Sequence, residues 1–449
     1  MKQKRVNNFS VLLIISLMIM NMCIVVAQTS TAPKVNETLT NVPPAKVIWQ
    51  KIFGGTADDR ALYTVPAKDG YLVVGSTKSI VPNTIVGWAL MLDNRGNAVW
   101  NKTFLEGSGT ELRFATNLTD GFLLVGNDNL SSGNVNGFVA KIDGQGALLW
   151  KTTIGGENVD KLFSAIATED GFLLLGSSSY NANGDSHALI AKIGSNGSLF
   201  WSKTYGNATD TVARIAVLAP GGYFMVAGYA DPRATNSYDF LLMKIDADGN
   251  LVWNKTYGGV GTQEAHSMTN GPDGYVIVGD TQSQNNDIHA WIVKVDFNGS
   301  LQWTATVGGK NADSPSYITA AQDGGYLVAG FTFSFGAGNR DFWLFKINDS
   351  GKVLWSCTQG DAGYQEAYNV IETSNNQYVI TGWTDPPGKP SLIGKAQYDF
   401  YVVEIEVPKN NPGLSSFQII ACALIVLVGL ASLFGLLKFR KKLGFSKAK

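Results

Sequence analysis

Residues 251–303, LVWNKTYGGVGTQEAHSMTNGPDGYVIVGDTQSQNNDIHAWIVKVDFNGSLQW, contain one unit of a repeat that fills most of the chain. Its tryptophan recurs at separations of 51, 50, 51, 52, 50 and 52 residues, at Trp49, Trp100, Trp150, Trp201, Trp253, Trp303 and Trp355. A repeat of about 50 residues with strand-like content is typical of stacked or ring-shaped architectures. One large repeat domain therefore fits the chain of 449 residues better than two or three separate domains.

The unit has the pattern of four strands joined by turns. Apolar runs alternate with glycine-rich loops, and an Asp-Gly pair at Asp273 precedes the second run, which is a strong hairpin signal. Runs such as FLLLG at 172–176 are almost wholly apolar, so both faces of these strands should be buried. A four-stranded unit of this period predicts a propeller blade. A parallel β-helix, the competing interpretation, has shorter coils and needs no pair of hairpins.

The two ends of the repeat complement each other. Residues 398–405 match the third strand of other units and have no fourth strand after them. Residues 46–53, KVIWQKIF, match a fourth strand and have no unit before them. The sequence therefore predicts an all-β fold over residues 45–407, a seven-bladed β-propeller of four-stranded antiparallel blades. The N-terminal strand completes the last blade, so no sheet edge is left exposed at the closure.

The motif DxxGxxxW precedes most of the repeat tryptophans. It begins at Asp93, Asp143, Asp246 and Asp296. This motif resembles the tryptophan-docking motif of pyrroloquinoline-quinone-type β-propellers, and the resemblance implies that each indole wedges between neighbouring blades. WNKTYGG and DGGYLVAG are similar to the repeats of secreted prokaryotic cell-surface propellers. The likeness covers residues 45 to 406.

Apolar runs at both ends of the chain predict a membrane-anchored surface protein. The basic start and apolar run of residues 1–27 indicate a secretory signal peptide or an uncleaved anchor. The uncharged run 417–437 has the length of a transmembrane helix and is followed by a basic tail, which the positive-inside rule places in the cytoplasm. The remaining segments are predicted to be linkers at 28–44 and 408–416 and a cytoplasmic tail at 438–449.

Charge and cysteine content limit the function of the outward part. Nine of the 35 basic residues lie in the two terminal segments, which leaves 26 basic against 36 acidic residues elsewhere. Nucleic acid is excluded as a partner because phosphate binding needs a basic surface. Cys357 is the only cysteine between the two apolar ends, so no disulfide can form within that part. The Asn-x-Ser/Thr sequons at predicted turns make Asn196, Asn298 and Asn348 the glycosylation candidates.

An acidic residue follows each repeat tryptophan by nine to eleven positions. These residues are Asp59, Glu111, Asp160, Asp210, Glu264, Asp313 and Glu366. Sevenfold repetition could place them in a ring of oxygen ligands suited to calcium. The alternative is that each carboxylate accepts hydrogen bonds from backbone N–H groups of its own turn. No cofactor is predicted beyond this calcium hypothesis.

Three aromatic residues break the repeat and suggest a ligand surface. Tyr229, Phe331 and Trp383 each follow the glycine that ends the second strand, where other units have small or polar residues. An aromatic crescent on blades four, six and seven could stack against sugar rings. The alternative is ordinary packing at a strand end.

The sequence favours a binding role over catalysis. No HExxH, GxSxG, phosphate-loop or CxxC motif occurs, so no catalytic residue is assigned. We expect a membrane-anchored extracellular propeller that binds a surface glycan or protein. A quinoprotein-like or glycan-cleaving enzyme and a purely structural cell-envelope protein are the alternatives.

Overall fold

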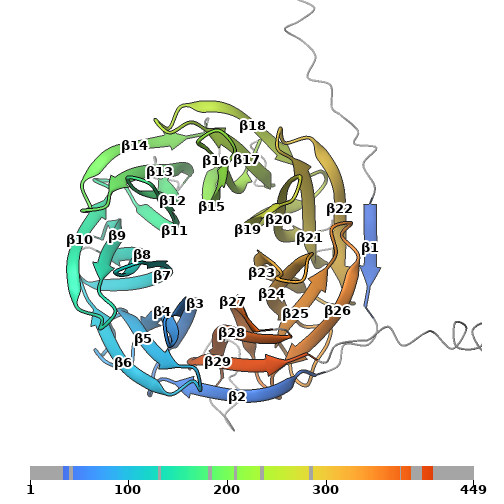
Figure 1. Ribbon diagram of the computed structural model, residues 1–449, viewed down its shortest axis with the longest axis horizontal. Coiled ribbons are helices and arrows are strands. Elements are labelled where there is room, and N and C mark those ends of the chain that lie inside the picture. The colour runs from blue at the N-terminus through green and yellow to red at the C-terminus, as the bar shows by residue number, and fades with distance from the viewer. Residues whose placement is uncertain are drawn as a thin grey trace, which may run out of the picture. The chain divides into compact units, whose positions relative to one another are not determined.

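The computed structural model describes residues 34–39, 44–129, 133–179, 185–206, 210–232, 237–282, 287–374, 376–385 and 397–407. These ranges form 29 strands grouped into seven sheets. Figure 1 shows the sheets as blades of a ring, each with one strand near the centre and one on the outer wall. The predicted seven-bladed, all-β fold is confirmed.

The first four blades each follow the chain from the centre outward. Blade one contains β3 (Asp59–Ala67), β4 (Gly70–Thr77), β5 (Val86–Asp93) and β6 (Ala98–Phe104). Blade two contains β7 (Gly109–Leu118), β8 (Gly121–Asn129), β9 (Val135–Ile142) and β10 (Leu148–Ile154). Blade three contains β11 (Asp160–Thr168), β12 (Gly171–Ser179), β13 (Ser186–Gly194) and β14 (Leu199–Tyr205). Blade four contains β15 (Thr211–Ala219), β16 (Tyr223–Ala230), β17 (Asp239–Ile245) and β18 (Leu251–Tyr257).

The last three blades include both additions from the N-terminal segment. Blade five contains β19 (Thr262–Gly271), β20 (Gly274–Gln282), β21 (Ile288–Asp296) and β22 (Leu301–Gly308), with β1 (Lys34–Thr38) beside β22. Blade six contains β23 (Asp313–Ala320), β24 (Tyr326–Thr332), β25 (Asp341–Ile347) and β26 (Val353–Gln359). Blade seven contains β27 (Gln365–Ser374), β28 (Gln377–Thr384), β29 (Asp399–Glu406) and β2 (Lys46–Phe53).

The ring closes between the two ends of the repeat, as the sequence predicts. Strand β2 pairs with β29 and forms the outer edge of blade seven. The hydroxyl of Tyr401 on β29 donates a hydrogen bond to the side-chain oxygen of Gln50 on β2, over 2.8 Å. Because β2 is also an outer strand, its Trp49 can contact blade one and complete the circle.

The core lies between blades rather than within them. Strand β12 is buried along almost its whole length on both faces. Leu173 and Leu175 from this strand share one apolar cluster with Val226 and Met243 of blade four. The continuous apolar runs in the sequence are thus explained by sheets that pack face to face.

Six of the seven outer-strand tryptophans pack on a turn glycine of the next blade. A Cβ atom at Gly249 would lie 2.7 Å from the Trp201 indole, and Gly249 has a φ of +73°. The Trp201 Nε1 donates a hydrogen bond to the Ala247 carbonyl of the same turn, over 3.3 Å. Five further pairs repeat this close contact: Trp49 with Gly96, Trp100 with Gly146, Trp150 with Gly197, Trp253 with Gly299 and Trp303 with Gly351.

Trp355 differs from the other six because blade seven is built from both ends of the chain. In blade seven, strands β29 and β2 come from opposite ends of the chain and are not joined by a DxxG turn. Blade seven therefore has no turn glycine for the Trp355 indole to pack on. Trp355 packs instead on Tyr378, with ring centroids 5.5 Å apart. The indole therefore contacts a turn glycine of the next blade at six junctions and an aromatic ring at the seventh.

The segment 28–44, predicted to be a linker, contains a strand. Strand β1 pairs with β22 in parallel, with Lys34 opposite Thr304. Pro44 then forms an isolated parallel bridge to Thr358 on β26, directly before β2 begins. The N-terminal segment therefore contacts the outer edges of blades five, six and seven in turn. Its pairing uses backbone groups, which leave no clear side-chain pattern in the sequence.

The predicted signal peptide, membrane segment and tail lie outside the described residues. The chain divides into two compact units, residues 1–405 and 406–449, and the second contributes only Glu406 and Val407 to the description. Within the described ranges, no helix is long and apolar enough to span a bilayer.

Substituting a docking glycine should destabilise the ring more than substituting an open glycine of the same conformation. Gly249→Ala adds a methyl group against Trp201, whereas Gly222, at a φ of +78°, has no neighbour within 4 Å. Both variants incur the left-handed strain of about 1–2 kcal/mol, and Gly249→Ala adds overpacking of about 1–3 kcal/mol. Urea unfolding of both variants measures the difference. Equal losses in the two variants would show that the indole contact does not stabilise the ring.

Deleting the closing strand should abolish the cooperative fold, whereas deleting only β1 should not. A chain without residues 28–43 keeps β2, while a chain without residues 28–53 leaves β29 with an unpaired edge. An exposed edge of this kind promotes aggregation. Size-exclusion chromatography and thermal unfolding compare the two deletions. Identical elution and melting behaviour would contradict closure by β2.

Candidate functional site

Every innermost strand has a β-bulge at the same place in each blade, and β27 has a second register shift between Glu372 and Ser374. The pairing register shifts between Ala213 and Ile215 in β15, for example, so that Arg214 is the extra residue. The seven bulge residues each stand thirteen positions after a repeat tryptophan: Leu62, Arg113, Phe163, Arg214, His266, Ser316 and Tyr368. A bulge redirects the side chain at its position. The fold therefore projects one side chain per blade toward the centre.

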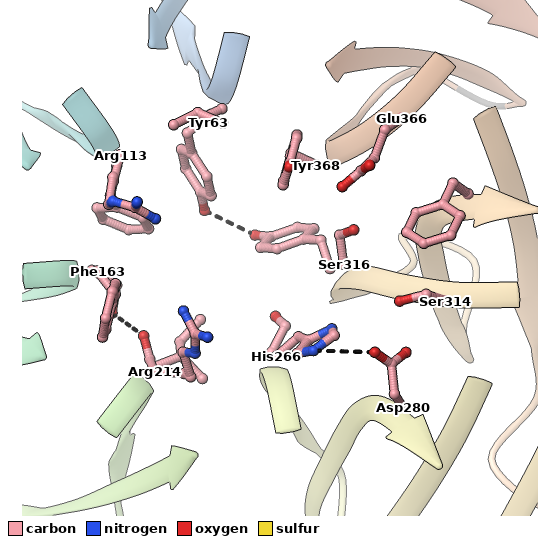
Figure 2. A pocket seen from close by; sticks show the side chains of 17 residues that line it. Tyr63, Arg113, Phe163, Arg214, His266, Asp280, Ser314, Ser316, Glu366 and Tyr368 are labelled. Carbon is pink, nitrogen blue, oxygen red and sulfur yellow. Dashed lines mark hydrogen bonds and ion pairs between the residues drawn. The ribbon is translucent and has the colours of Figure 1, made fainter. Parts of the chain in front are cut away.

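The bulge residues line a central cavity of about 360 Å³. Figure 2 shows their side chains converging from all sides of the ring. This volume falls within the range of about 300–1,000 Å³ that is usual for small-molecule sites. The cavity is the candidate functional site.

A glycine on the second strand makes each bulge possible. At Gly228 on β16, an added Cβ would lie 1.9 Å from the carbonyl oxygen of Val212, two residues before the bulge residue. The equivalent clash is between 1.8 and 2.0 Å at the other six glycines: Gly75, Gly126, Gly176, Gly279, Gly330 and Gly382. Only a residue without a side chain leaves room for the displaced backbone. The glycine that ends each apolar run in the sequence thus lies on the second strand, against the backbone at the bulge of the innermost strand.

Blades two to four form a cationic side of the cavity, here called the arginine wall: Arg113, Phe163 and Arg214. The Arg214 guanidinium lies 4.5 Å from the centre of the Phe163 ring, and that of Arg113 lies 5.6 Å from it. Arg113 forms an ion pair with Glu111 over 2.7 Å. In the described part of the chain, no carboxylate pairs with Arg214. The arginine wall therefore contains one paired and one unpaired positive charge.

Blades six and seven form the opposite side, here called the hydroxyl wall: Ser314, Ser316 and Tyr368. Figure 2 shows these residues across the cavity from Arg113 and Phe163. Ser267 of blade five also lines the cavity, and its buried hydroxyl has no hydrogen-bond partner in the structure. The wall offers hydrogen-bond donors and acceptors without adding charge.

His266 and Asp280 of blade five lie beside the hydroxyl wall. The His266 Nδ1 lies 2.7 Å from the Pro315 carbonyl oxygen, so this nitrogen carries the hydrogen. Its Nε2 faces the Asp280 carboxylate at 3.5 Å. Burial raises the pKa of Asp280, and His266 acts in the opposite direction.

A pair of tyrosines, Tyr63 and Tyr317, also lines the cavity. The Tyr63 hydroxyl donates a hydrogen bond to that of Tyr317 over 3.2 Å, from blade one to blade six. Burial raises the pKa of both phenols, so both stay neutral. Residues further along the same strands, such as Thr64 and Thr319, line a second cavity of about 400 Å³. Tyr63 and Tyr317 line both cavities.

The structure does not place the predicted aromatic crescent on one exposed surface. Trp383 is only 4% exposed and stacks on Tyr398, with ring centroids 4.0 Å apart. Tyr229 packs behind the cavity, with its ring 5.4 Å from the Arg214 guanidinium. Phe331 lines the cavity, but its ring is covered by Arg340 at 4.3 Å. The alternative of packing at a strand end describes Trp383 and Tyr229, whereas Phe331 belongs to the site.

The seven predicted acids do not form one ring, because they occupy three different register positions. Asp59, Asp160 and Asp313 are the first residues of their inner strands, and they pair opposite residues 77, 178 and 332. Glu111, Glu264 and Glu366 stand one position later, and Asp210 stands one position earlier. Adjacent positions of a strand point to opposite faces. Among the described residues, no group of three or more acidic, histidine or cysteine side chains could hold a metal ion.

The acids at the first register position cap their own loops, which was the alternative interpretation. Asp160 accepts a hydrogen bond from the Gly156 backbone N–H over 2.9 Å, and Asp59 accepts one from Gly55 over 2.8 Å. Asp313 does the same for Gly309 over 2.6 Å. These carboxylates therefore satisfy backbone donors and hold the loops in place.

The glycosylation candidates all lie on turns between third and fourth strands. Asn196 and Asn298 are exposed, whereas Asn348 is half-buried. The Asn348 Oδ1 accepts hydrogen bonds from the backbone N–H groups of Ser350 and Lys352 over 3.1 and 3.0 Å. Glycosylation at these three positions stays a prediction.

Sequence reasoning missed the residues of the arginine wall and His266. Their signal was present in the constant offset of thirteen residues from each tryptophan, where the amino acid changes from unit to unit. The acids at offsets of nine to eleven were more conspicuous because their charge repeats. Their varying offset shows that they do not share a structural position.

The strand pairing and the central cavity define the chain as a seven-bladed β-propeller with a ligand-sized pocket on its axis. No protein-family model matches the chain, and no curated protein matches it. Among solved structures, Sqt1 from Chaetomium thermophilum is similar at a TM-score of 0.45 and 11% identity, covering 81% of this chain and 99% of that one. A subtype N10 neuraminidase-like protein of A/little yellow-shouldered bat/Guatemala has a TM-score of 0.38 and 12% identity, covering 80% and 99%.

Removing the space for a bulge should destabilise the propeller. Gly228→Ala places a methyl group on the Val212 carbonyl and forces β15 away from its register at Arg214. We expect a loss of about 3 kcal/mol in the free energy of unfolding, at the upper end of ordinary overpacking. Gly144→Ala is the control because nothing lies within 4 Å of its added methyl group. Chemical denaturation of both variants gives the comparison, and a Gly228→Ala protein as stable as the control would refute the clash.

Proposed function

We propose that this protein is a membrane-anchored binding propeller that takes a ligand, the end of a surface glycan, into its central cavity. The observation that carries this proposal is that some positions of the repeat have the same residue in most units, whereas the positions around the cavity differ from unit to unit. Tryptophan and glycine recur at the docking positions, whereas six different residue types occupy the seven bulge positions. Uniform positions build the scaffold, and varied positions around one cavity suit recognition of an asymmetric ligand.

The membrane anchor is supported by the sequence alone. The uncharged run 417–437 followed by Lys438 and Arg440 has the length and flanking charge of a single span with the tail in the cytoplasm. This orientation places the propeller outside the cell, where glycans and surface proteins are the available partners. The acidic balance of the outward part is compatible with either class.

The cavity chemistry supports a glycan more than a protein surface. A space of about 360 Å³ between the blades admits a sugar unit but not a folded partner. Polar hydroxyls and charged groups alternate with aromatic side chains along its wall, as in sites that orient a polar ligand. A protein partner would have to insert a single side chain.

Filling the cavity should abolish binding. We expect the full chain in detergent micelles to bind members of a glycan array, and Ser316→Trp to remove that binding because the indole occupies the cavity. Ser202→Trp is the matched control, since Ser202 is exposed on outer strand β14. Fluorescence on the array and titration of each hit give the affinities. The proposal fails when no glycan binds the parent chain, or when Ser316→Trp binds as well as Ser202→Trp.

A further inference from the structure

We propose that the ligand of the central cavity is an acidic sugar, whose ring carboxylate binds Arg214 while its hydroxyls face the hydroxyl wall. This inference rests on the proposed function and names the ligand class of the same site.

Arg214 is positioned to receive an anion. Its backbone carbonyl accepts a hydrogen bond from the Ser164 hydroxyl over 2.6 Å, which ties the bulge of blade four to blade three. Its guanidinium is held between two aromatic rings, 4.5 Å from the centre of Phe163 and 5.4 Å from that of Tyr229. This packing limits the motion of the side chain, so little freedom is lost when it binds a carboxylate.

Part of the hydrogen-bonding capacity of Arg214 is unused within the described part of the protein, although its side chain also contacts the Tyr229 hydroxyl. Its Nε is buried and has no hydrogen-bond partner in the structure, and no carboxylate there lies within ion-pair distance. A buried donor without a partner is costly, and a ligand carboxylate would satisfy it. Arginine also matches a carboxylate with two parallel hydrogen bonds, which favours a planar anion over a simple point charge.

The other ionisable groups of the cavity already face a residue of the opposite type, acid against base. Arg113 pairs with Glu111 over 2.7 Å, and Glu366 pairs with Arg340. Asp280 faces His266 at 3.5 Å. Arg214 is therefore the charge for which the described residues supply no counter-ion, and the ligand should bring one negative group.

The rest of the ligand should be rich in hydroxyl groups. The side opposite Arg113 and Phe163 presents Ser314, Ser316 and Tyr368. Ser314 bonds to Asp280 and Tyr368 to Glu366, whereas the buried Ser267 hydroxyl has no partner in the structure. Hydroxyls of this kind both donate and accept hydrogen bonds, as sugar hydroxyls do. A fatty acid or an aromatic acid would leave the buried Ser267 hydroxyl unpaired, at a cost in binding free energy. A uronic acid combines the carboxylate with the hydroxyls.

Pairs of sugars that differ only in the charged group test this inference directly. D-Glucuronate, D-galacturonate and D-mannuronate are each titrated against glucose, galactose and mannose, with the full chain in detergent micelles and calorimetry or ligand-observed NMR as the readout. We expect at least one uronate to bind about 10-fold or more tightly than its hexose, the usual effect of a charge-assisted hydrogen bond. The inference is overturned when no uronate binds, or when every hexose binds as tightly as its uronate.

Variants at Arg214 separate this inference from the proposed function. Arg214→Gln should reduce uronate binding about 10-fold or more and hexose binding by a clearly smaller factor, and Arg214→Lys should retain part of the preference because it keeps the charge. Arg95→Gln, on an exposed turn of blade one, should change neither. When Ser316→Trp abolishes glycan binding but Arg214→Gln leaves the uronate preference intact, the binding function stands and the acidic-sugar inference falls.

Discussion

The contact between a tryptophan of one blade and a turn of the next is the interaction on which the ring depends. At six junctions the indole lies against a glycine whose missing side chain makes the approach possible. The blades have no separate cores, since clusters such as that of Leu173 and Val226 are shared by neighbours. A blade therefore becomes stable only when it is held against the next one, and the array must close on itself to bury its last faces.

Most of the fold could be predicted from the sequence because its determinants repeat. The tryptophan spacing gave the number of blades, and the apolar runs showed that the sheets are buried on both sides. The incomplete units at residues 46–53 and 398–405 predicted how the ring closes, and strands β2 and β29 confirm it. Strand β1 was missed because KVNET has no apolar pattern and is held on β22 through backbone pairing.

The site was harder to predict because it depends on a shift of a single residue. In a strand, moving one position along the sequence reverses the direction of the side chain. The acids near the start of each inner strand look equivalent in the sequence but occupy three registers, so Asp160 caps a loop while Glu111 pairs with an arginine. A bulge adds one more shift and turns Arg214 toward the axis. Sequence periodicity alone does not show which strands contain such a bulge.

The joining of β2 to β29 has a consequence for how the chain acquires its structure during synthesis. These strands are neighbours in space, yet Gln50 and Tyr401 are 351 residues apart in the sequence. The early strand has no partner until almost the whole polypeptide has left the ribosome, and pairings of such high contact order form slowly. Until then its apolar residues and those of blade one remain available to wrong partners. Because blade seven is completed last, the open array of blades can close into a ring only after the final residues of β29 have been synthesised.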